Sequence, residues 1–137
     1  MKWLNRNQRS APRSSPIFSI ATYLRLSAGS PAPFGFAETM RTATPNGGTH
    51  GEMTLDGQRI MMGQGSKEWR MGSAHAAEAA TQGIFIYLAD VDAHYERAQA
   101  AGPEIVKPPE DLPYGRSYTA RDPEGHPWFF TTPPAER

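Results

Sequence analysis

The feature that most constrains this chain is the stretch from Tyr114 to Thr132, in which two β-forming runs flank a tight turn. Pro123 presets the backbone for the turn, the Asp122 carboxylate can accept backbone N–H bonds, and Gly125 can adopt the left-handed conformation that closes it. The run after the turn contains three consecutive aromatic residues, Trp128–Phe130. Because so aromatic a hairpin is unstable alone in water, we expect it to line a core or a pocket.

A second pattern, Gly83–Gly102, predicts a strand followed by a helix. Aliphatic residues alternate with Phe85 and Tyr87 along the strand, so the two kinds of side chain point to opposite faces. Asp90 is suited to capping the helix, and Gly102 is suited to ending it. His94 falls on the helix face that we expect to be solvated.

The remaining elements predict a β-rich chain in which one helix is missing. Ser27–Phe34 contains Pro31 and Pro33, which exclude a stable helix between the first two strands, so the face of the first strand lacks a cover. Further expectations are an edge strand at Pro103–Val106 and a loop at Pro108–Pro113. Other strands are expected at Ile17–Leu26, Phe36–Ala43, Thr49–Leu55 and Gln58–Gly63, with turns at Pro45–Gly48 and Asp56–Gly57.

Composition excludes several classes of function. Fourteen Lys and Arg balance fourteen Asp and Glu, so no overall field favours nucleic acid or an anionic membrane. The absence of cysteine excludes disulfides and thiolate zinc sites. No apolar run approaches the roughly 18 residues of a membrane span, and the basic start has no apolar signal region. We therefore expect a cytoplasmic protein that binds neither nucleic acid nor membrane.

The turn Asp122–His126 and the aromatic strand after it resemble the last hairpin of the vicinal oxygen chelate superfamily, which includes glyoxalase I, ring-cleaving dioxygenases, fosfomycin-resistance enzymes and bleomycin-binding proteins. Gly83–Gly102 resembles the strand and helix that open the second module of that family, and Pro108–Arg116 resembles the loop before its third strand. A weaker resemblance covers Ile20–Gly65.

The resemblance implies an α+β fold of two paired βαβββ modules that form a curved mixed sheet around a cup-shaped pocket, often in a homodimer. Here the first module would have a loop in place of its helix. We expect a flexible basic tail at residues 1–16 and a single domain at 17–134. Within it, module one spans 17–65, the linker spans 66–82 and module two spans 83–132.

Enzymes of that superfamily bind a divalent metal through His, Glu or Gln on the strands that line the cup. When these positions are carried over, three of them fall on Ala21, Gly83 and Phe129, which have no donor atom in the side chain. Only Glu52 matches a ligand. A catalytic metal needs about three protein ligands, so we expect neither a metal nor another cofactor.

These observations predict a metal-independent small-molecule binding protein that forms a homodimer and sequesters an aromatic or toxic compound. One alternative is a lyase or isomerase of the same superfamily, in which His50 and Glu52 on one strand face act as base and orienter or hold a metal unconventionally. Another is a degraded member with a structural role, whose rings only fill the core. The candidate ligand-binding residues are aromatic or basic: Tyr23, Arg25, Trp69, Phe85, Tyr87, Tyr114, Arg116 and Phe129.

Overall fold

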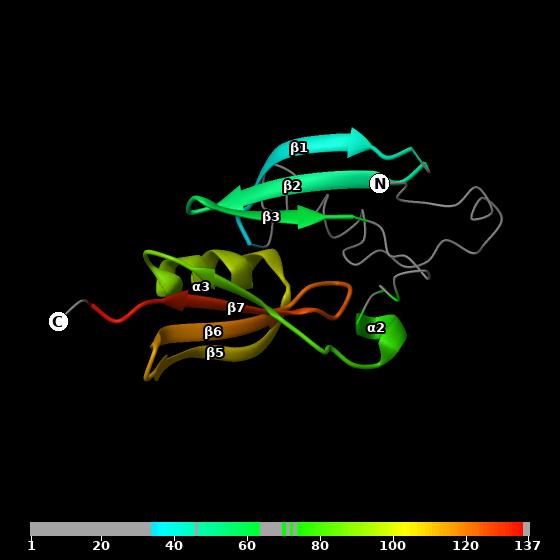
Figure 1. The fold of residues 1–137 in the computed structure, drawn as a ribbon. Coiled ribbons are helices and arrows are strands. Elements are labelled where there is room, and N and C mark those ends of the chain that lie inside the picture. The colour runs from blue at the N-terminus through cyan, green and yellow to red at the C-terminus, as the bar shows by residue number, and fades with distance from the viewer. Residues whose placement is uncertain (1–33, 46, 64–69, 71, 73, 136–137) are drawn as a thin grey trace.

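The computed structural model describes residues 34–45, 47–63, 70, 72 and 74–135, and this part of the chain has an α+β fold with two sheets (Figure 1). The three-stranded sheet has the order β1-β2-β3, and the four-stranded sheet has the order β4-β7-β6-β5. The elements along the chain are β1 (Ala37–Ala43), β2 (Thr49–Leu55), β3 (Gln58–Met62), α2 (Ala74–Ala77), β4 (Ile84–Tyr87), α3 (Val91–Ala101), β5 (Glu104–Leu112), β6 (Gly115–Arg121) and β7 (Pro127–Thr132).

The second half of the chain forms the predicted strand–helix–three-strand module. β4 lies parallel to β7, and the other pairs in its sheet are antiparallel. The helix α3 begins after Asp90, whose carboxylate accepts a hydrogen bond from the Ala93 N–H at 3.0 Å. It ends at Gly102, which has a left-handed φ of 84°. Both caps were predicted, because each depends on residues close in sequence.

The first half contributes β1, β2 and β3, which match three of its four predicted strands. A short turn at Asp56 and Gly57 joins β2 to β3, as expected. The predicted tail, the first strand, and the helix-excluding loop up to residue 33 lie outside the described residues.

One hydrophobic core joins the two sheets. Phe34 packs on Trp128 and Phe130, with ring centroids 5.5 and 5.0 Å apart. Trp128 and Phe130 are fully buried, and by alternation they face the side of β7 opposite to Phe129. The other buried apolar residues of this core are Phe36, Met53, Met62, Ile86, Leu88, Val91, Ala98, Tyr118 and Ala120. The helix α3 contacts β5, β6 and β7, so this core face of the four-stranded sheet is covered.

The turn between β6 and β7 is organised by the buried carboxylate of Asp122. It accepts hydrogen bonds from the backbone N–H of Glu124 at 2.8 Å and of His126 at 3.0 Å, and from the Trp128 indole N–H at 3.0 Å. Gly125 has a φ of 85°, the conformation expected from the sequence. The hairpin predicted between Tyr114 and Thr132 is therefore present.

The prediction that His94 is solvated was wrong. The side chain is 4% exposed, and its ring lies 4.6 Å from that of Phe130. Its Nε2 lies 3.0 Å from the Phe34 carbonyl oxygen, and its Nδ1 lies 2.8 Å from the Tyr118 hydroxyl. The helix pattern alone gave no sign of this, because the covering residue Phe34 comes from the other half of the chain.

The predicted loop at Pro108–Pro113 was also wrong for most of its length. β5 continues to Leu112 as an edge strand paired with β6. The pairing has two register shifts, one between Ile105 and Lys107 and one between Lys107 and Glu110, and the second contains both prolines. A proline has no N–H to donate, and an edge strand with bulges tolerates that loss. The linker expected at 66–82 contains the one-turn helix α2 among its described residues.

Candidate functional site

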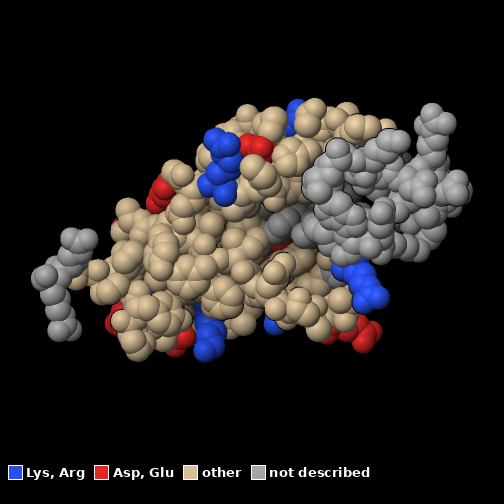
Figure 2. Space-filling model, in the orientation of Figure 1, with Lys and Arg blue, Asp and Glu red and all other residues tan. Residues whose placement is uncertain are grey.

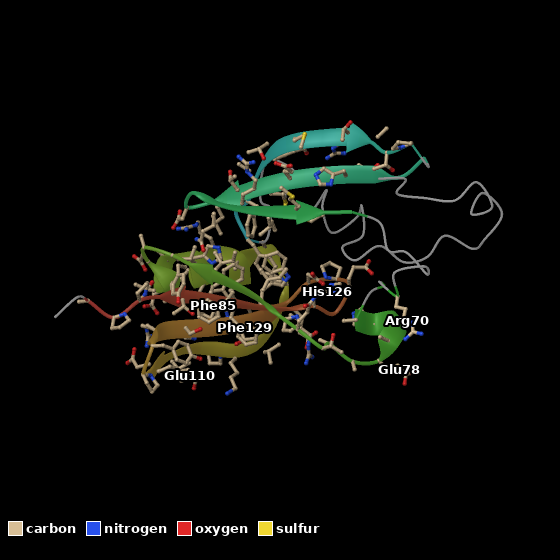
Figure 3. All side chains as sticks on the ribbon, viewed as in Figure 1. Arg70, Glu78, Phe85, Glu110, His126 and Phe129 are labelled. Atoms are coloured by element: carbon tan, nitrogen blue, oxygen red, sulfur yellow. The ribbon has the colours of Figure 1, made fainter. Side chains whose placement is uncertain are left out.

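Four aromatic side chains gather on the face of the four-stranded sheet opposite α3, and we call Phe85, Tyr87, Tyr114 and Phe129 the ring face. The Phe85 ring lies 5.2 Å from that of Tyr87, 6.1 Å from that of Tyr114 and 6.3 Å from that of Phe129. Phe85 is 41% exposed, and the two tyrosines are each 52% exposed. Figure 3 shows Phe85 and Phe129 beside each other over the sheet.

The strand register brings these rings together. Phe85 on β4 pairs with Phe129 on β7, and Phe129 pairs with Thr119 on β6. Paired residues project to the same side of a sheet, so the alternation that buries Trp128 and Phe130 turns Phe129 outward. Tyr114 comes from the turn between β5 and β6 and reaches the same group of rings.

Gly83 explains how the Phe129 ring can lie where it does. A Cβ built on Gly83 would stand 2.5 Å from Cε2 of Phe129 and 3.1 Å from the Pro127 carbonyl oxygen. The ring therefore occupies the space into which any side chain at position 83 would project. It lies nearly parallel to the Phe85 ring, at 19°.

Two hydroxyl groups in the same sheet face are already used within the protein. Thr131 pairs with Tyr87 on one side and with Ser117 on the other. Thr131 is fully buried and Ser117 is 4% exposed. The Thr131 hydroxyl donates to Ser117 Oγ at 2.8 Å, and the Ser117 hydroxyl donates to the Phe130 carbonyl at 3.1 Å. Each hydroxyl therefore donates its one proton within the protein, and neither has a proton left to donate to a ligand.

Two ion pairs lie on the same sheet face as the rings, at the strands β5 and β6. Lys107 Nζ lies 3.5 Å from Glu110 Oε1, and Arg121 Nη1 lies 2.9 Å from Glu104 Oε1. Sequence reasoning missed Lys107 and Glu110, because it placed Glu110 in a loop. The bulges in β5 set their direction, and bulges leave little trace in a single sequence.

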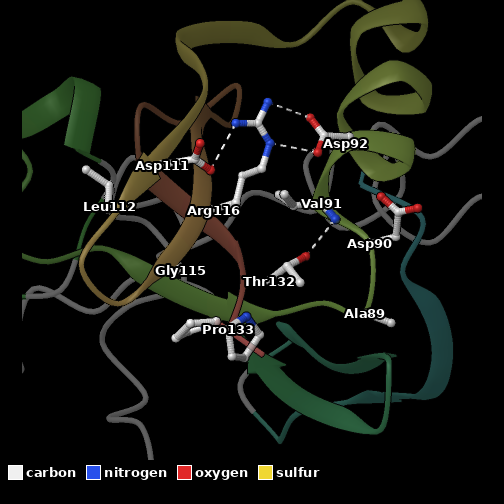
Figure 4. A pocket seen from close by; sticks show the side chains of 11 residues that line it. Ala89, Asp90, Val91, Asp92, Asp111, Leu112, Gly115, Arg116, Thr132 and Pro133 are labelled. Atoms are coloured by element: carbon white, nitrogen blue, oxygen red, sulfur yellow. Dashed lines mark hydrogen bonds and ion pairs between the residues drawn. The ribbon is translucent and has the colours of Figure 1, made fainter. Parts of the chain in front are cut away.

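Arg116, a predicted ligand-binding residue, pairs with Thr132 and so projects to the side of the sheet opposite Phe129. Figure 4 shows it beside Asp92 and Asp111. Its guanidinium donates to both carboxylate oxygens of Asp92, at 2.7 and 3.0 Å, and to Asp111 at 3.2 Å. The bond to Arg116 lowers the pKa of the Asp92 carboxyl, and the two aspartates raise the pKa of Arg116. These residues line a hollow of about 360 Å³ together with Val91, Thr132 and Pro133. The guanidinium is thus already bonded to two carboxylates.

His50 and Glu52 lie together on β2, on the sheet face that points away from Met53 and the core. His50 Nε2 is 3.4 Å from Glu52 Oε1, and Arg59 Nη1 is 3.5 Å from Glu52 Oε2. Glu52 is 8% exposed. The pair has the composition of a base and its orienter, and Arg59 partly neutralises the carboxylate.

The described residues do not fit the divalent metal that the fold family implies. Of the carried-over positions, Glu52 has a donor, Gly83 has no side chain, and the Phe129 ring fills the space beside Gly83. No three His, Asp or Glu side chains of the described chain converge on one point. The position corresponding to Ala21 lies outside the described residues, as do the predicted ligand-binding residues Tyr23, Arg25 and Trp69.

On the side shown in Figure 2, basic and acidic side chains are interspersed, and neither sign gathers into a large patch. None of the described helices has the length and apolar character that crossing a bilayer requires.

Comparisons with known proteins agree on one family. The model of the Glyoxalase/Bleomycin resistance protein/Dioxygenase superfamily matches residues 32–130. TioX from Micromonospora sp. ML1 is 30% identical, with 86% of this chain and 87% of that chain covered and a TM-score of 0.56. No curated protein matches the chain.

Two more distant structures share the fold. TnmS3, an antibiotic binding protein from Streptomyces sp. CB03234, is 19% identical, covering 83% of this chain and 84% of its own, with a TM-score of 0.62. The fosfomycin resistance protein FosX from Mesorhizobium loti is 19% identical, covering 86% of both chains, with a TM-score of 0.57.

Proposed function

Because this chain belongs to the glyoxalase/bleomycin resistance protein/dioxygenase superfamily, we propose that it binds a flat aromatic small molecule on the ring face, without a metal. The observation that carries the proposal is the exposure of Phe85, Tyr87 and Tyr114, at 41%, 52% and 52%. A group of exposed rings on one sheet face is typical of an interaction site. Rings with phenol hydroxyls combine stacking area with hydrogen-bonding capacity, which suits an aromatic ligand.

Metal independence is part of the proposal, and the chemistry of the donor set supports it. Gly83 and Phe129 stand at two positions where metal-binding members have ligands, and neither side chain has a lone pair to offer. Their mutual packing contributes an apolar surface instead. A site that has rings in place of metal ligands is suited to holding a ligand rather than to polarising one.

Sequestration of a toxic compound is the role that we propose for this binding. Among the proteins with the same fold is one described as an antibiotic binding protein, from Streptomyces sp. CB03234. Others are described as fosfomycin resistance proteins. A protein that binds such a compound without converting it lowers its free concentration in proportion to the amount of protein present.

The test is calorimetric titration with a panel of planar aromatic antibiotics, together with the shift of the melting temperature that binding produces. For a ligand that binds, Phe85→Ala is expected to weaken binding about tenfold, because one exposed stacking contact is lost. Val106→Ala is the matched control, since Val106 is 40% exposed on β5 and is not part of the ring face. Equal loss of affinity in both variants, or no binding by the wild-type protein to any planar compound, contradicts the proposal.

A lyase or isomerase is the second candidate, and the contact between His50 and Glu52 favours it. Elemental analysis of the purified protein and assays with small dicarbonyl substrates distinguish the two candidates. Stoichiometric zinc, nickel, manganese or iron that is lost in Glu52→Gln favours the enzyme, as does turnover that is lost in His50→Gln. Ligand binding without turnover and without metal favours sequestration.

A purely structural role is the third candidate, and ligand binding alone decides against it.

For assembly, we propose a homodimer, because the prolines at positions 31 and 33 exclude the helix that would cover the first module. We propose that this dimer is cytoplasmic. Sedimentation at micromolar concentration is expected to give the mass of a dimer. A stable monomer under these conditions contradicts this part of the proposal.

A further inference from the structure

The ring face ends at β5 in a pair of opposite charges, and this pair points to the class of ligand. We infer that the ring face selects aromatic ligands whose polar end has no net charge, such as a carboxamide or a zwitterion, because Lys107 and Glu110 both face that end. This inference rests on the proposed function and adds to it the chemistry of the ligand.

The strand register gives the geometry. Lys107 pairs with Thr119, Thr119 pairs with Phe129, and Phe129 pairs with Phe85. All four residues therefore lie in one row across the sheet, on the same side. Neighbouring strands are about 4.8 Å apart, so about 10 Å separate the backbones of Phe129 and Lys107. Two or three fused rings span that length, which places a terminal substituent near the ammonium group.

Glu110 belongs to the adjacent row, with Ser117, Thr131 and Tyr87. The hydroxyls of Ser117 and Thr131 are buried and bonded within the protein. In this row, therefore, neither hydroxyl has a proton left to donate to the polar end of a ligand on the rings. In the first row, the partly buried Thr119 carries a hydroxyl between Phe129 and Lys107. The charged groups of the two rows are Lys107 and Glu110 at the outer strand, and Figure 3 labels Glu110 there.

The Lys107–Glu110 pair is open to a ligand. Its atoms are 3.5 Å apart, and the side chains are 64% and 46% exposed. An exposed pair of this kind contributes little to stability, so rearranging it costs little. The ammonium group has three donors and the carboxylate has about four acceptor sites, so most of their hydrogen-bonding capacity remains after they bond to each other.

Opposite charges this close to each other disfavour a ligand with a single charge. A carboxylate at the end of the ligand is attracted by Lys107 and repelled by Glu110, and an ammonium group experiences the reverse. A carboxamide offers an acceptor to Lys107 and donors to Glu110 without a repulsive contact. The same balance favours a zwitterion in the matching orientation.

The second pair on this sheet face, Arg121 with Glu104, serves as an internal control. It lies in the row of Pro127, which contains none of the four aromatic side chains. The distance between Arg121 Nη1 and Glu104 Oε1 is shorter, at 2.9 Å. The inference therefore assigns the selection of the polar end to Lys107 and Glu110 alone.

The experiment measures the affinity of the whole protein for three acridines with the polar group on an outer ring, at low ionic strength: acridine-2-carboxamide, acridine-2-carboxylate and 2-(aminomethyl)acridine. The wild-type protein is expected to bind the carboxamide about threefold to fivefold more tightly than either charged compound. Lys107→Met leaves Glu110 unbalanced and is expected to make the amine the tightest ligand. Glu110→Gln leaves Lys107 unbalanced and is expected to make the carboxylate the tightest ligand.

Glu104→Gln is the control and is expected to keep the wild-type order. Binding of acridines with one order of affinity in wild type, Lys107→Met and Glu110→Gln overturns this inference and leaves the proposed function standing. A change of order in Glu104→Gln as large as in Glu110→Gln overturns it as well. If no acridine binds to the wild-type protein, this inference is overturned, whereas the proposed function is contradicted only if the panel of planar antibiotics also fails to bind.

Discussion

The Phe129 ring occupies the space into which a side chain on Gly83 would project. A methyl group on residue 83 would stand 2.5 Å from the Phe129 ring and must displace it. The ring is the far part of a side chain that is only partly buried, so it can move at a small cost in stability. A glycine at this position thus determines where a neighbouring ring lies.

Gly83→Ala is accordingly expected to weaken binding of an aromatic ligand about fivefold, because the stack of Phe129 on Phe85 is disturbed, and to lower the melting temperature only slightly. Gly83→Ala combined with Phe129→Ala removes the clash and is the control. If the double variant binds no more weakly than Phe129→Ala alone, the effect of the glycine acts through the ring. Unchanged affinity in Gly83→Ala contradicts the expectation.

The contact between the His94 ring and the Phe34 carbonyl connects the two halves of the chain. In its neutral form, an Nε2–H donates to the Phe34 carbonyl, and Nδ1 accepts from the Tyr118 hydroxyl. Burial lowers the pKa of His94, and the nearby Arg97 lowers it further, whereas the Phe34 carbonyl and Asp56 act in the opposite direction. Burial also raises the pKa of the Tyr118 hydroxyl, which keeps it protonated as a donor.

The stability of the protein is therefore expected to fall below about pH 6.5. The unfolded chain takes up a proton on His94 near the ordinary pKa of 6.5, whereas the folded state stays neutral to lower pH. The contribution of the neutral histidine is complete above that pH and declines as the pH falls toward the pKa of the folded state. Urea unfolding at a series of pH values measures it, with His94→Gln as the reference. Equal pH dependence in the two proteins contradicts the assignment to His94.

At the scale of elements, the Asp122 carboxylate holds the β6–β7 turn and the indole of Trp128 at once. Because the side chain of Asp122 is fully buried, its removal takes a carboxylate acceptor away from two backbone N–H groups and from the indole N–H. The turn and the core beneath it therefore depend on one group.

Asp122→Ala is expected to lower the free energy of unfolding by about 3 kcal/mol, since hydrogen bonds to a charged acceptor and a buried donor are lost. Asp122→Asn retains one carbonyl acceptor and is expected to cost less. Chemical denaturation measures both, with Glu124→Ala in the same turn as the control. A loss in Glu124→Ala that equals the loss in Asp122→Ala contradicts the central role of Asp122.

At the scale of the whole molecule, the turn of the three-stranded sheet docks on the edge of β4. The Gln58 side chain accepts from the Tyr87 N–H at 2.8 Å and donates to the Tyr87 carbonyl. The Asp56 carboxylate accepts from the Ala89 N–H at 3.3 Å. Side chains thus supply to the edge strand the bonds that a neighbouring strand would otherwise make.

Gln58→Ala is expected to speed hydrogen exchange at Tyr87 several-fold while exchange at Phe130 in the same sheet is unchanged, because only the edge contact opens. Gln58→Glu is the matched variant: it keeps an acceptor for the Tyr87 N–H and loses the donor to its carbonyl. Faster exchange throughout the four-stranded sheet would instead mean that the docking supports the entire fold.

The sequence by itself determined the elements whose causes are local. Asp122 with Gly125 defined the last turn, Asp90 with Gly102 defined the ends of α3, and alternation separated Phe129 from its buried neighbours. Each of these features depends on residues that lie within a few positions of one another or along one element, so a single sequence contains the signal.

Only the tertiary structure decided the features that depend on distant partners. His94 is buried because Phe34 packs on it, β5 extends through two prolines because β6 pairs with it, and Lys107 faces the rings because bulges shift the register. Arg116 was predicted beside the rings and lies with Asp92 instead. Pairing and packing between segments far apart in the chain outweigh local preferences, because the free energy of burial and of cross-strand bonds is gained only when those segments meet.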